Sequence, residues 1–212
     1  MLARILEHYK VMGTKEKVKK IDEYLRLLSE RREWAGLTSR GVSEDPVNAV
    51  VDSLGILSLL DSKEKRAVID IGSGGGLVGV VISITCPDWE VVMAESSARK
   101  AVFLAEVIGS LGLGNAGVER ERAENLSGRL MFDAAVGRAA GGLGSIAETA
   151  LGLLLPGGLH IAIKGSRVEN EVRNAIEAIE ASGGELVGIE KPGYPDEFGI
   201  PDRVSLVVIR KI

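Results

Sequence analysis

The chain reads AVIDIGSGGGLVG from Ala67 to Gly79, and this stretch decides the fold. Its first part, Val68–Ile71, is a short apolar run of the kind that forms a parallel strand buried on both faces. Four of the five residues from Gly72 to Gly76 are glycines. Glycine adopts positive φ freely and lets a ligand approach the main chain closely. The stretch therefore predicts a strand, a ligand-binding turn and the start of a helix.

An acidic residue completes this pattern about 20 positions further on. Glu95 closes an expected strand at residues 89–94, and Ser96 and Ser97 follow as candidates for the N-cap of a helix. Three glycines also match the dinucleotide pattern G-x-G-x-x-G, namely Gly74, Gly76 and Gly79. A carboxylate in this place accepts hydrogen bonds from ribose hydroxyls. The turn and the acid together predict a nucleoside cofactor, and both a dinucleotide and S-adenosylmethionine carry the ribose.

Strands and helices alternate along most of the chain, after a helical N-terminal region. We expect helices near residues 2–11, 15–34, 46–60, 76–85, 97–111, 142–154 and 167–181. We expect strands near residues 66–71, 90–95, 116–120, 132–137, 159–164, 185–191 and 204–210. Alternating βα units predict an α/β fold, with a mostly parallel sheet and the ligand at the carboxyl ends of its strands. The segment 192–203 is rich in proline and glycine, so the last two strands can pair antiparallel without a helix between them.

Several pieces of the chain, in unbroken order from about residue 20 to about residue 165, resemble the RsmG (GidB) family. They are residues 70–79, 94–96, Lys100 with Phe103 and Leu104, 122–124, 132–139 and 163–165, with Leu37-Thr38 and Asp52-Ser53-Leu54 upstream. Members of that family transfer a methyl group from S-adenosylmethionine to N7 of a guanine in 16S ribosomal RNA.

The resemblance implies a class I, Rossmann-like methyltransferase with a seven-stranded, mostly parallel sheet and an antiparallel last strand. It implies S-adenosylmethionine as cofactor, S-adenosylhomocysteine as product, and 16S ribosomal RNA or the small ribosomal subunit as partner. The cofactor contacts that it implies are Gly72, Gly74, Gly76, Leu77, Glu95, Ala123, Glu124 and Arg138. We expect Asp70 to orient the turn through backbone amides.

Two cations close expected strands at the reaction end. Arg138 follows the fourth strand, and we assign it to positioning, on a carboxylate of the cofactor or a phosphate of the RNA, because its planar fork suits both. Lys164 holds a similar place at the end of the fifth strand and is a weaker candidate for a phosphate contact. Methylation at N7 needs no general base, because this nitrogen carries a lone pair and no hydrogen.

The chain departs from the family pattern at four places. Val78 stands where the family has proline, and Gly137 where it has serine. In the N-terminal region the family's Trp-Asn pair is replaced by Arg31-Arg32, and its Arg-His pair by Asn48-Ala49. The second pair of changes bears on the RNA target more than on the cofactor.

The charge is divided unevenly along the chain. Residues 1–40 hold 10 lysines and arginines against 6 acidic residues, although the whole chain has a net charge of −4. We divide the chain into an N-terminal helical region, residues 1–62, and a methyltransferase domain, residues 63–212. Phosphate contacts should concentrate in the basic segment, since neutralised phosphates supply most sequence-independent affinity for RNA. The candidate substrate contacts there are Lys17, Lys20, Arg31 and Arg32.

Cysteine and histidine are scarce. Cys86 is the only cysteine, and its place before Pro87 indicates a helix end and a small core residue. His8 and His160 are the only histidines, so the sequence predicts no metal site. No apolar run reaches the length of a membrane span, and charged residues interrupt the first ten positions. We therefore expect a cytoplasmic protein without a membrane partner.

Three alternatives to guanine-N7 methylation of 16S ribosomal RNA stay open. A methyltransferase of the same fold can act on another RNA or on a small molecule. An NAD-dependent oxidoreductase would share the glycine turn and the acid, but it would not need an antiparallel last strand. A non-enzymatic ribosome-assembly factor could use the same surface. The sequence alone does not give the oligomeric state, or decide between naked RNA and an assembled subunit.

Overall fold

The computed structural model describes residues 1–37, 46–60, 64–138, 141–194, 198–200 and 203–212. Thr38, Ala139 and parts of the expected loop at 192–203 lie outside these residues. The strands are β1 (Ala67–Ile71), β2 (Glu90–Ala94), β3 (Ala116–Glu119), β4 (Phe132–Arg138), β5 (Leu154–Lys164), β6 (Gly184–Glu190) and β7 (Ser205–Lys211). The helices are α1 (Leu2–His8), α2 (Thr14–Ala35), α4 (Pro46–Leu54), α5 (Gly79–Thr85), α6 (Ala98–Leu111), α7 (Leu143–Leu151) and α8 (Val168–Ala181), with 3-10 turns η1 (Gly55–Ser58) and η2 (Ala123–Leu126).

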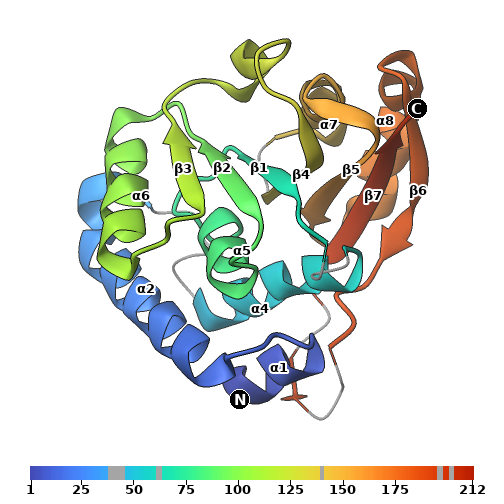
Figure 1. Ribbon diagram of the computed structural model, residues 1–212. Helices are drawn as coiled ribbons and strands as arrows, with labels where there is room; N and C mark the ends of the chain where they lie inside the picture. Colours follow the sequence, from blue (N-terminus) through green and yellow to red (C-terminus); the bar gives the residue numbers. More distant parts are fainter. Residues whose placement is uncertain (38–45, 61–63, 139–140, 195–197, 201–202) are drawn as a thin grey trace.

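The seven strands form one sheet in the order β3-β2-β1-β4-β5-β7-β6 (Figure 1). The pairs from β3 to β5 are parallel, whereas β7 runs antiparallel to both β5 and β6. This confirms the expected mostly parallel sheet with an antiparallel last strand. Because β1 lies between β2 and β4, the turn after β1 stands at the point where the strand order reverses, which is where open α/β sheets bind ligands.

The sheet is covered on both faces. One hydrophobic cluster joins residues of β1 and β2 to residues of α1, α2, α4, α5 and α6. A second cluster joins the other face to η2, α7 and α8. The burial of both faces explains why the apolar residues Val68 and Ile69 of β1 are adjacent and do not alternate with polar ones.

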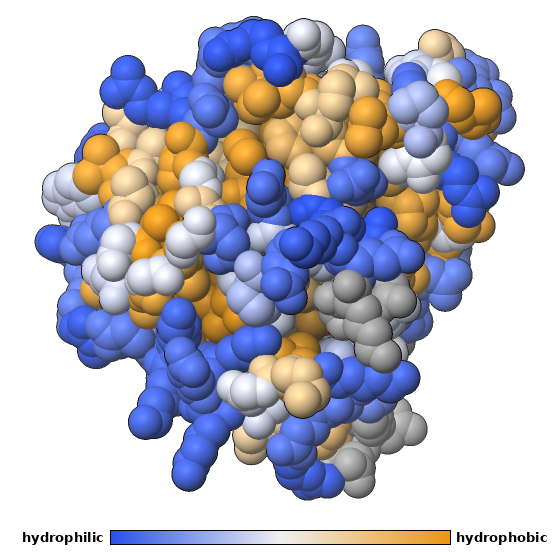
Figure 2. Space-filling model, viewed as in Figure 1, coloured by the Kyte–Doolittle hydropathy of each residue, from blue (hydrophilic) through white to orange (hydrophobic). Residues whose placement is uncertain are grey.

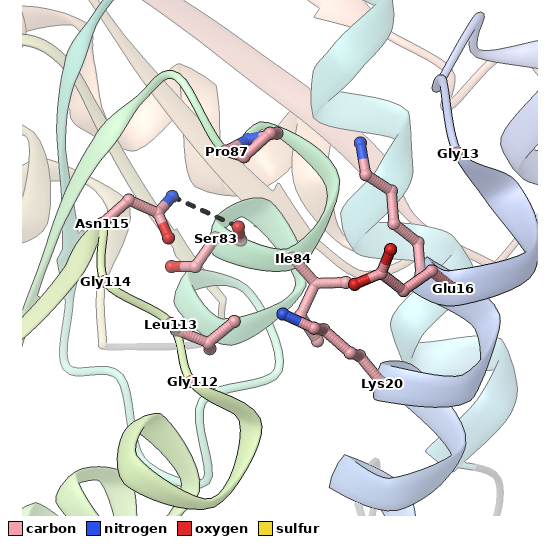
Figure 3. A pocket seen from close by; sticks show the side chains of 11 residues that line it. Gly13, Glu16, Lys20, Ser83, Ile84, Pro87, Gly112, Leu113, Gly114 and Asn115 are labelled. Carbon is pink, nitrogen blue, oxygen red and sulfur yellow. Dashed lines mark hydrogen bonds between the residues drawn. The ribbon is translucent and has the colours of Figure 1, made fainter.

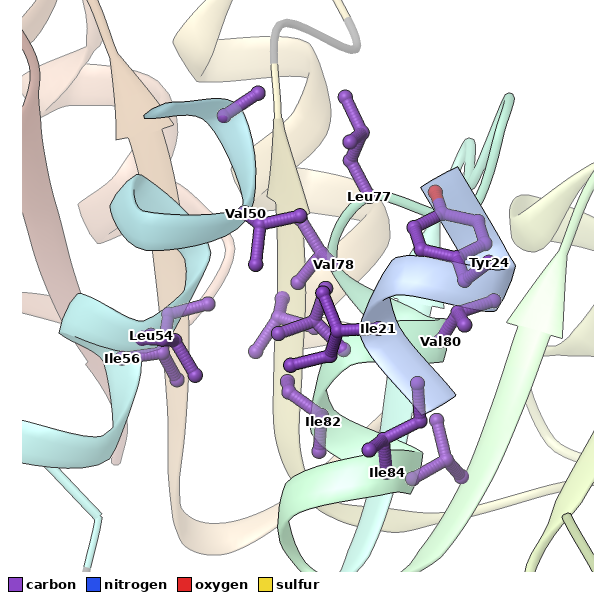
Figure 4. Packing of buried hydrophobic residues seen from close by; sticks show 14 of the residues in the cluster. Ile21, Tyr24, Val50, Leu54, Ile56, Leu77, Val78, Val80, Ile82 and Ile84 are labelled. Atoms are coloured by element: carbon purple, nitrogen blue, oxygen red, sulfur yellow. The ribbon is translucent and has the colours of Figure 1, made fainter. Parts of the chain in front are cut away.

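The N-terminal helices belong to the first of these clusters. Ile21 and Tyr24 of α2 are fully buried and pack near Val80 and Ile84 of α5 (Figure 4). The contact is apolar and continuous with the core of the sheet. The division between residues 1–62 and 63–212 stays a prediction. The two parts pack against each other in one shared hydrophobic core.

The expected boundary between α7 and β5 is wrong. The helix ends at Leu151 rather than near residue 154, and β5 begins at Leu154 rather than near residue 159. Leu154 pairs with Phe132, but Leu159 already pairs with Ala134, so β5 carries a bulge. A Cβ at Gly158 would lie 2.9 Å from the carbonyl oxygen of Asp133. The Pro-Gly-Gly sequence therefore forms a bulge inside a strand instead of a break before it.

The lone cysteine and the second histidine are core residues, as expected. Cys86 caps the C-terminus of α5 and is buried, and burial raises the pKa of its thiol to about 11. His160 lies inside β5, where its Nδ1 is 3.1 Å from the carbonyl oxygen of Ala135. Burial lowers the pKa of this imidazole to about 4, so it is neutral. Among the described residues, no helix is both long and apolar enough to cross a membrane.

Candidate functional site

The turn after β1 is held from several sides. The N–H groups of Gly72 and Ser73 both donate to the carbonyl oxygen of Ala94 at the end of β2. From outside the sheet, the buried hydroxyl of Tyr24 in α2 donates to the carbonyl oxygen of Gly75 at 2.7 Å. No pattern in the sequence predicts this contact from the N-terminal helix. Residues of both predicted parts of the chain, 1–62 and 63–212, therefore hold the turn in place without a ligand.

Two of the glycines in the turn have different reasons to be glycine. A Cβ at Gly74 would have no neighbour nearer than 3.8 Å, so its φ of 57° decides the residue type. A Cβ at Gly76 would lie 2.6 Å from Cγ2 of Val80 and 2.8 Å from Cδ2 of Leu104. The space at Gly74 is therefore open, whereas at Gly76 the missing side chain makes room for the protein's own core.

Glu95 joins the turn to the start of α6. Its carboxylate is largely buried and accepts the N–H of Gly74 at 2.9 Å and the N–H of Ser97 at 2.8 Å. Ser97 is the N-cap residue of α6, which confirms one of the two expected caps. A carboxylate has about four acceptor positions, so two remain for a ligand. These two hydrogen bonds fix the orientation of the Glu95 carboxylate at the carboxyl end of β2.

A cavity of about 320 Å³ opens at this end of the sheet. It is lined by Ile71, Gly72, Ala94, Glu95, Ser96, Glu121, Arg122, Ala123, Glu124, Ser145, Ile146 and Thr149. Four of the expected cofactor residues, from three separate segments, meet in it. Ala123 is buried, whereas the Glu124 carboxylate is half exposed and lies 3.7 Å from the guanidinium of Arg122. The mixture of apolar wall and carboxylates suits an adenosine group.

Asp70 lies beneath the turn and orients it. Its carboxylate is fully buried, and Oδ2 accepts the N–H of Gly79 at 2.9 Å, which confirms a backbone contact at the start of α5. Burial raises the pKa of this carboxyl to about 6 from its ordinary value of 3.8. Asp70 does not line the cavity, so its contact with the turn is structural.

The buried Asp70 and His160 should have opposite effects on stability between pH 4 and 6.5. Asp70 binds a proton more tightly in the folded state, so the free energy of unfolding falls by about 3 kcal/mol as pH rises through this window. His160 binds its proton more weakly when folded, so its contribution rises by about 3 kcal/mol over the same window. The two contributions nearly cancel in the wild type.

Replacing either residue should reveal the pH dependence of stability that the other one causes. In urea unfolding, an Asp70→Asn variant should gain stability, relative to wild type, as pH rises from 4 to 6.5. A His160→Leu variant should lose it. Parallel curves for wild type and both variants would contradict the burial of these two groups.

Arg138 stands at the other side of the turn, at the carboxyl end of β4. Its Nη1 donates to Oδ2 of Asp52 at 3.0 Å and contacts the carbonyl oxygen of Ala49 at 3.4 Å, both from α4. Arg203, just before β7, brings its Nη2 to 3.3 Å from the same Asp52 oxygen. Asp52 is fully buried. Sequence reasoning missed this cluster, although a charged residue between Val51 and Leu54 in an apolar helix signals a buried carboxylate in need of a partner.

Leu77 and Lys164 are both buried, in different settings. Leu77 belongs to the cluster between the sheet and the N-terminal helices. The ammonium of Lys164 donates to the carbonyl oxygen of Gly141 at 2.8 Å and lies 3.0 Å from a carboxylate oxygen of Glu171. The lysine is therefore buried and paired rather than solvated. Its contacts hold the segment after β4 to the start of α8.

The four candidate RNA contacts divide into two paired and two free cations. Lys17 donates to the carbonyl oxygen of Thr85 at 2.8 Å, and burial lowers the pKa of its ammonium. Arg31 lies 2.8 Å from a carboxylate oxygen of Glu106 in α6. Within the part of the chain that the structure describes, Lys20 and Arg32 have no ion pair. Arg31 thus links α2 to α6, and Arg32 is a free cation beside it.

A larger cavity of about 520 Å³ lies near the amino ends of the strands, beside the residues that precede β3 (Figure 3). Glu16 and Lys20 of α2 face α5 across it. One polar donor in its wall serves the protein, because the Asn115 amide donates to the carbonyl oxygens of Ser83, Cys86 and Trp89. Volume alone would make this cavity the better candidate for a ligand site. The smaller cavity, however, is lined by the carboxylates of Glu95 and Glu124 and by Gly72 of the turn. No cluster of three metal-ligating side chains occurs among the described residues.

Comparison with solved structures identifies the fold. A SAM dependent methyltransferase from Aquifex aeolicus superimposes with a TM-score of 0.62 over 80% of this chain and 94% of its own, at 15% identity. A precorrin-6y C5,15-methyltransferase from Geobacter metallireducens does so with a TM-score of 0.56 over 82% of this chain and 93% of its own, at 17% identity. The architecture is that of the class I methyltransferases.

Sequence comparison is more specific. The chain is 36% identical to the ribosomal RNA small subunit methyltransferase G of Pelotomaculum thermopropionicum, over 95% of this chain and 85% of the relative. It is 33% identical to the enzyme of the same name from Caldicellulosiruptor bescii, over all of this chain and 91% of the relative. The profile of the GidB family, described as rRNA small subunit methyltransferase G, matches residues 17–195. The chain belongs to this family of ribosomal RNA methyltransferases.

Proposed function

We propose that this enzyme transfers the methyl group of S-adenosylmethionine to N7 of a guanine in 16S ribosomal RNA and releases S-adenosylhomocysteine. The observation that carries the cofactor is Glu95, whose carboxylate is fixed beside the glycine turn in the cavity at the carboxyl ends of the strands. The names of the relatives support ribosomal RNA as substrate. An enzyme that acts on this RNA works in the cytoplasm.

The residues around the turn fit such a cofactor from both ends. On the side of β2 and β3, Glu95 has acceptor positions for the ribose hydroxyls, and Ala123 and Glu124 flank a place for the adenine ring. On the side of β4, Arg138 lies at the carboxyl end of its strand, level with the start of the turn, and its guanidinium can bind a carboxylate or a phosphate. When bound, S-adenosylmethionine supplies an electrophilic methyl group on a sulfonium.

The protein's part in the reaction is positioning. Attack by the N7 lone pair releases no proton, so a general base is unnecessary. Neither histidine nor the cysteine lies in the cavity, which accords with this chemistry. Holding the base in line with the methyl group at near-attack distance can lower the barrier by several kcal/mol, up to about 7–11 kcal/mol. Arg138 and the turn supply rigid points for that alignment.

Transfer of a tritiated methyl group tests the proposal. Small subunits and free 16S RNA from cells without this modification are incubated with the enzyme and labelled cofactor, and the nucleosides are then separated. Label in N7-methylguanine is the expected result, and the better substrate of the two shows whether the enzyme needs an assembled subunit. Binding of the cofactor without label in either RNA would direct the search to another RNA or a small molecule. Binding of NAD instead would favour the oxidoreductase.

Lys20 and Arg32 are the free cations with which we test RNA binding. Hydrophilic side chains cover α2 along the lower left of Figure 2. A Lys20→Ala/Arg32→Ala variant should bind RNA on the order of 10-fold more weakly at physiological salt, and the slope of log K against log salt should fall by about 1.4 for two lost phosphate contacts. Filter binding over a series of salt concentrations measures both quantities.

The matched control removes two cations elsewhere. Arg173 of α8 and Arg210 of β7 are both exposed. An Arg173→Ala/Arg210→Ala variant should leave the salt slope at the wild-type value. An equal change in both double variants would show that net charge, and not the α2 surface, governs binding.

A further inference from the structure

The larger cavity is separate from the site at the glycine turn. It lies near the amino ends of the strands, and no residue of the turn lines it. Three segments form it, namely α2, the end of α5 and the connection from α6 to β3 (Figure 3). Its volume of about 520 Å³ is within the range of small-molecule sites, which is about 300–1,000 Å³.

One part of the cavity, the apolar wall, consists of Ile84, Pro87 and Leu113. Ile84 and Leu113 are largely buried, and Pro87 is exposed at the edge. Gly114 leaves open space beside this wall, since a Cβ there would have no neighbour within 4 Å. The apolar wall and the open space suit a flat ring such as a nucleobase.

The carbonyl oxygens at the C-terminus of α5 already have partners. The side-chain amide of Asn115 donates to the carbonyl oxygens of Ser83 and Cys86. The ammonium of Lys17 donates to the carbonyl oxygen of Thr85 at 2.8 Å. Free carbonyl groups at a helix end would repel an anion. Because Lys17 and Asn115 occupy these groups, the end of α5 does not exclude an anion from the cavity.

Several donors around the cavity have no partner. The ammonium of Lys20 points across the cavity toward Leu113 (Figure 3), and it makes no ion pair within the described ranges of the chain. The backbone N–H groups of Gly114 and Asn115 donate to no described residue. Ammonium groups and successive backbone N–H groups are common partners of phosphate in proteins. These donors therefore suit a phosphate group on the ligand.

Two acceptors of the cavity are unused as well. The Glu16 carboxylate lies four residues before Lys20, a spacing that allows an ion pair, yet the two side chains form none. The side-chain contacts of Asn115 all use Nδ2, so its Oδ1 accepts no hydrogen bond from a described residue. A bare phosphate would be repelled by Glu16. A nucleotide, in contrast, brings N–H groups on its base for both oxygens.

We infer that this cavity binds a nucleotide, with the phosphate on Lys20 and the N–H groups of residues 114 and 115. The base lies against the apolar wall, and its N–H groups donate to Glu16 and to Oδ1 of Asn115. Guanine, which carries both a ring N–H and an amino group, fits these two acceptors. A free mononucleotide and a nucleotide of the bound RNA have the same chemistry, and only the second source rests on the proposed function.

Calorimetric titration with guanosine monophosphate (GMP) tests the inference. The protein is first saturated with S-adenosylhomocysteine, so that the nucleotide does not occupy the cofactor site. We expect GMP to bind, and we expect guanosine and inorganic phosphate each to bind on the order of 10-fold more weakly, because each lacks one part of the contacts. Absence of GMP binding to the wild type would overturn the inference.

Two variants show whether GMP binds in this cavity. Gly114→Leu places a side chain in the open space without a positive φ, and it should weaken GMP binding at least about 10-fold. Lys20→Met should weaken GMP about 10-fold and leave guanosine within about 2-fold of the wild type. Unchanged GMP affinity in Gly114→Leu would contradict binding in this cavity.

Gly109→Leu is the matched control. A Cβ at this exposed glycine of α6 also meets open space, but the residue does not line the cavity. The control should bind GMP like the wild type, and thermal unfolding should show that all three variants are folded. Equal losses of GMP affinity in Gly109→Leu and Gly114→Leu would overturn the inference.

RNA binding by the same variants identifies the source of the nucleotide. If Gly114→Leu weakens the binding of both GMP and 16S RNA, and Gly109→Leu weakens neither, the nucleotide belongs to the RNA. If only GMP binding is weakened, the ligand is a free mononucleotide. A protein that binds GMP in this cavity but places no label in ribosomal RNA would leave only the proposed function wrong. Label in N7-methylguanine, with a GMP affinity that Gly114→Leu does not change, would leave only this inference wrong.

Discussion

A Glu95→Ala variant is expected to bind S-adenosylmethionine on the order of 100-fold more weakly than the wild type. The carboxylate is fixed by the N–H groups of Gly74 and Ser97, and it offers its remaining acceptor positions to the ribose hydroxyls. A hydrogen bond to a charged group contributes about 1.5–3 kcal/mol, so the loss of two such bonds costs about 3 kcal/mol or more. Isothermal titration calorimetry with the purified variant measures this loss.

Two further variants separate the ribose contact from general damage. Glu95→Gln keeps the shape and one acceptor oxygen, and it should bind with intermediate affinity. Glu90→Ala removes an exposed carboxylate at the opposite end of the same strand and should leave affinity unchanged. A Glu95→Ala protein with wild-type affinity would remove Glu95 from the site. Intact activity in ribosome assembly, despite lost cofactor binding, would instead favour the assembly-factor alternative.

The local patterns of the sequence predict the sheet and one half of the site. The apolar residues before Gly72 and the acidic residue Glu95 each mark the end of a strand. Parallel strands place their carboxyl ends at the same end of the sheet. The pairing of β1 with β2 then brings these residues together without further information. The antiparallel ending could be predicted because the segment between β6 and β7 is too rich in proline and glycine for a crossover helix.

The other half of the site depends on contacts that no local pattern contains. Arg138 and Asp52 are 86 residues apart, and Tyr24 reaches Gly75 from a helix that looks like any amphipathic helix. Lys164 illustrates the same point, because a lysine at the end of a strand is normally solvated, and its burial depends on Glu171 and the carbonyl of Gly141. Such side-chain pairs arise from tertiary packing, so the sequence suggests candidates but does not choose their partners.

Arg138→Ala should lower methyl transfer at least about 100-fold, because small losses of alignment between the base and the methyl group have effects of this size. The same change leaves Asp52 with one guanidinium instead of two. Loss of a partner from a buried ion pair costs about 3–5 kcal/mol, and Arg203 offsets part of it, so the variant should be less stable and still folded. Single-turnover methyl transfer and thermal unfolding measure the two effects.

The two effects of Arg138 can be separated with a second change. In an Asp52→Asn/Arg138→Met variant, the carboxylate that needs a counterion is gone and the aliphatic stem of the arginine is replaced, so stability should return toward the wild-type value. Methyl transfer should stay low, because no guanidinium faces the turn from β4. Recovery of turnover together with stability would mean that Arg138 acts only as the counterion of Asp52. Turnover that stays low in a stable protein, and below that of an Asp52→Asn single variant, would place the arginine in the alignment of the reacting groups.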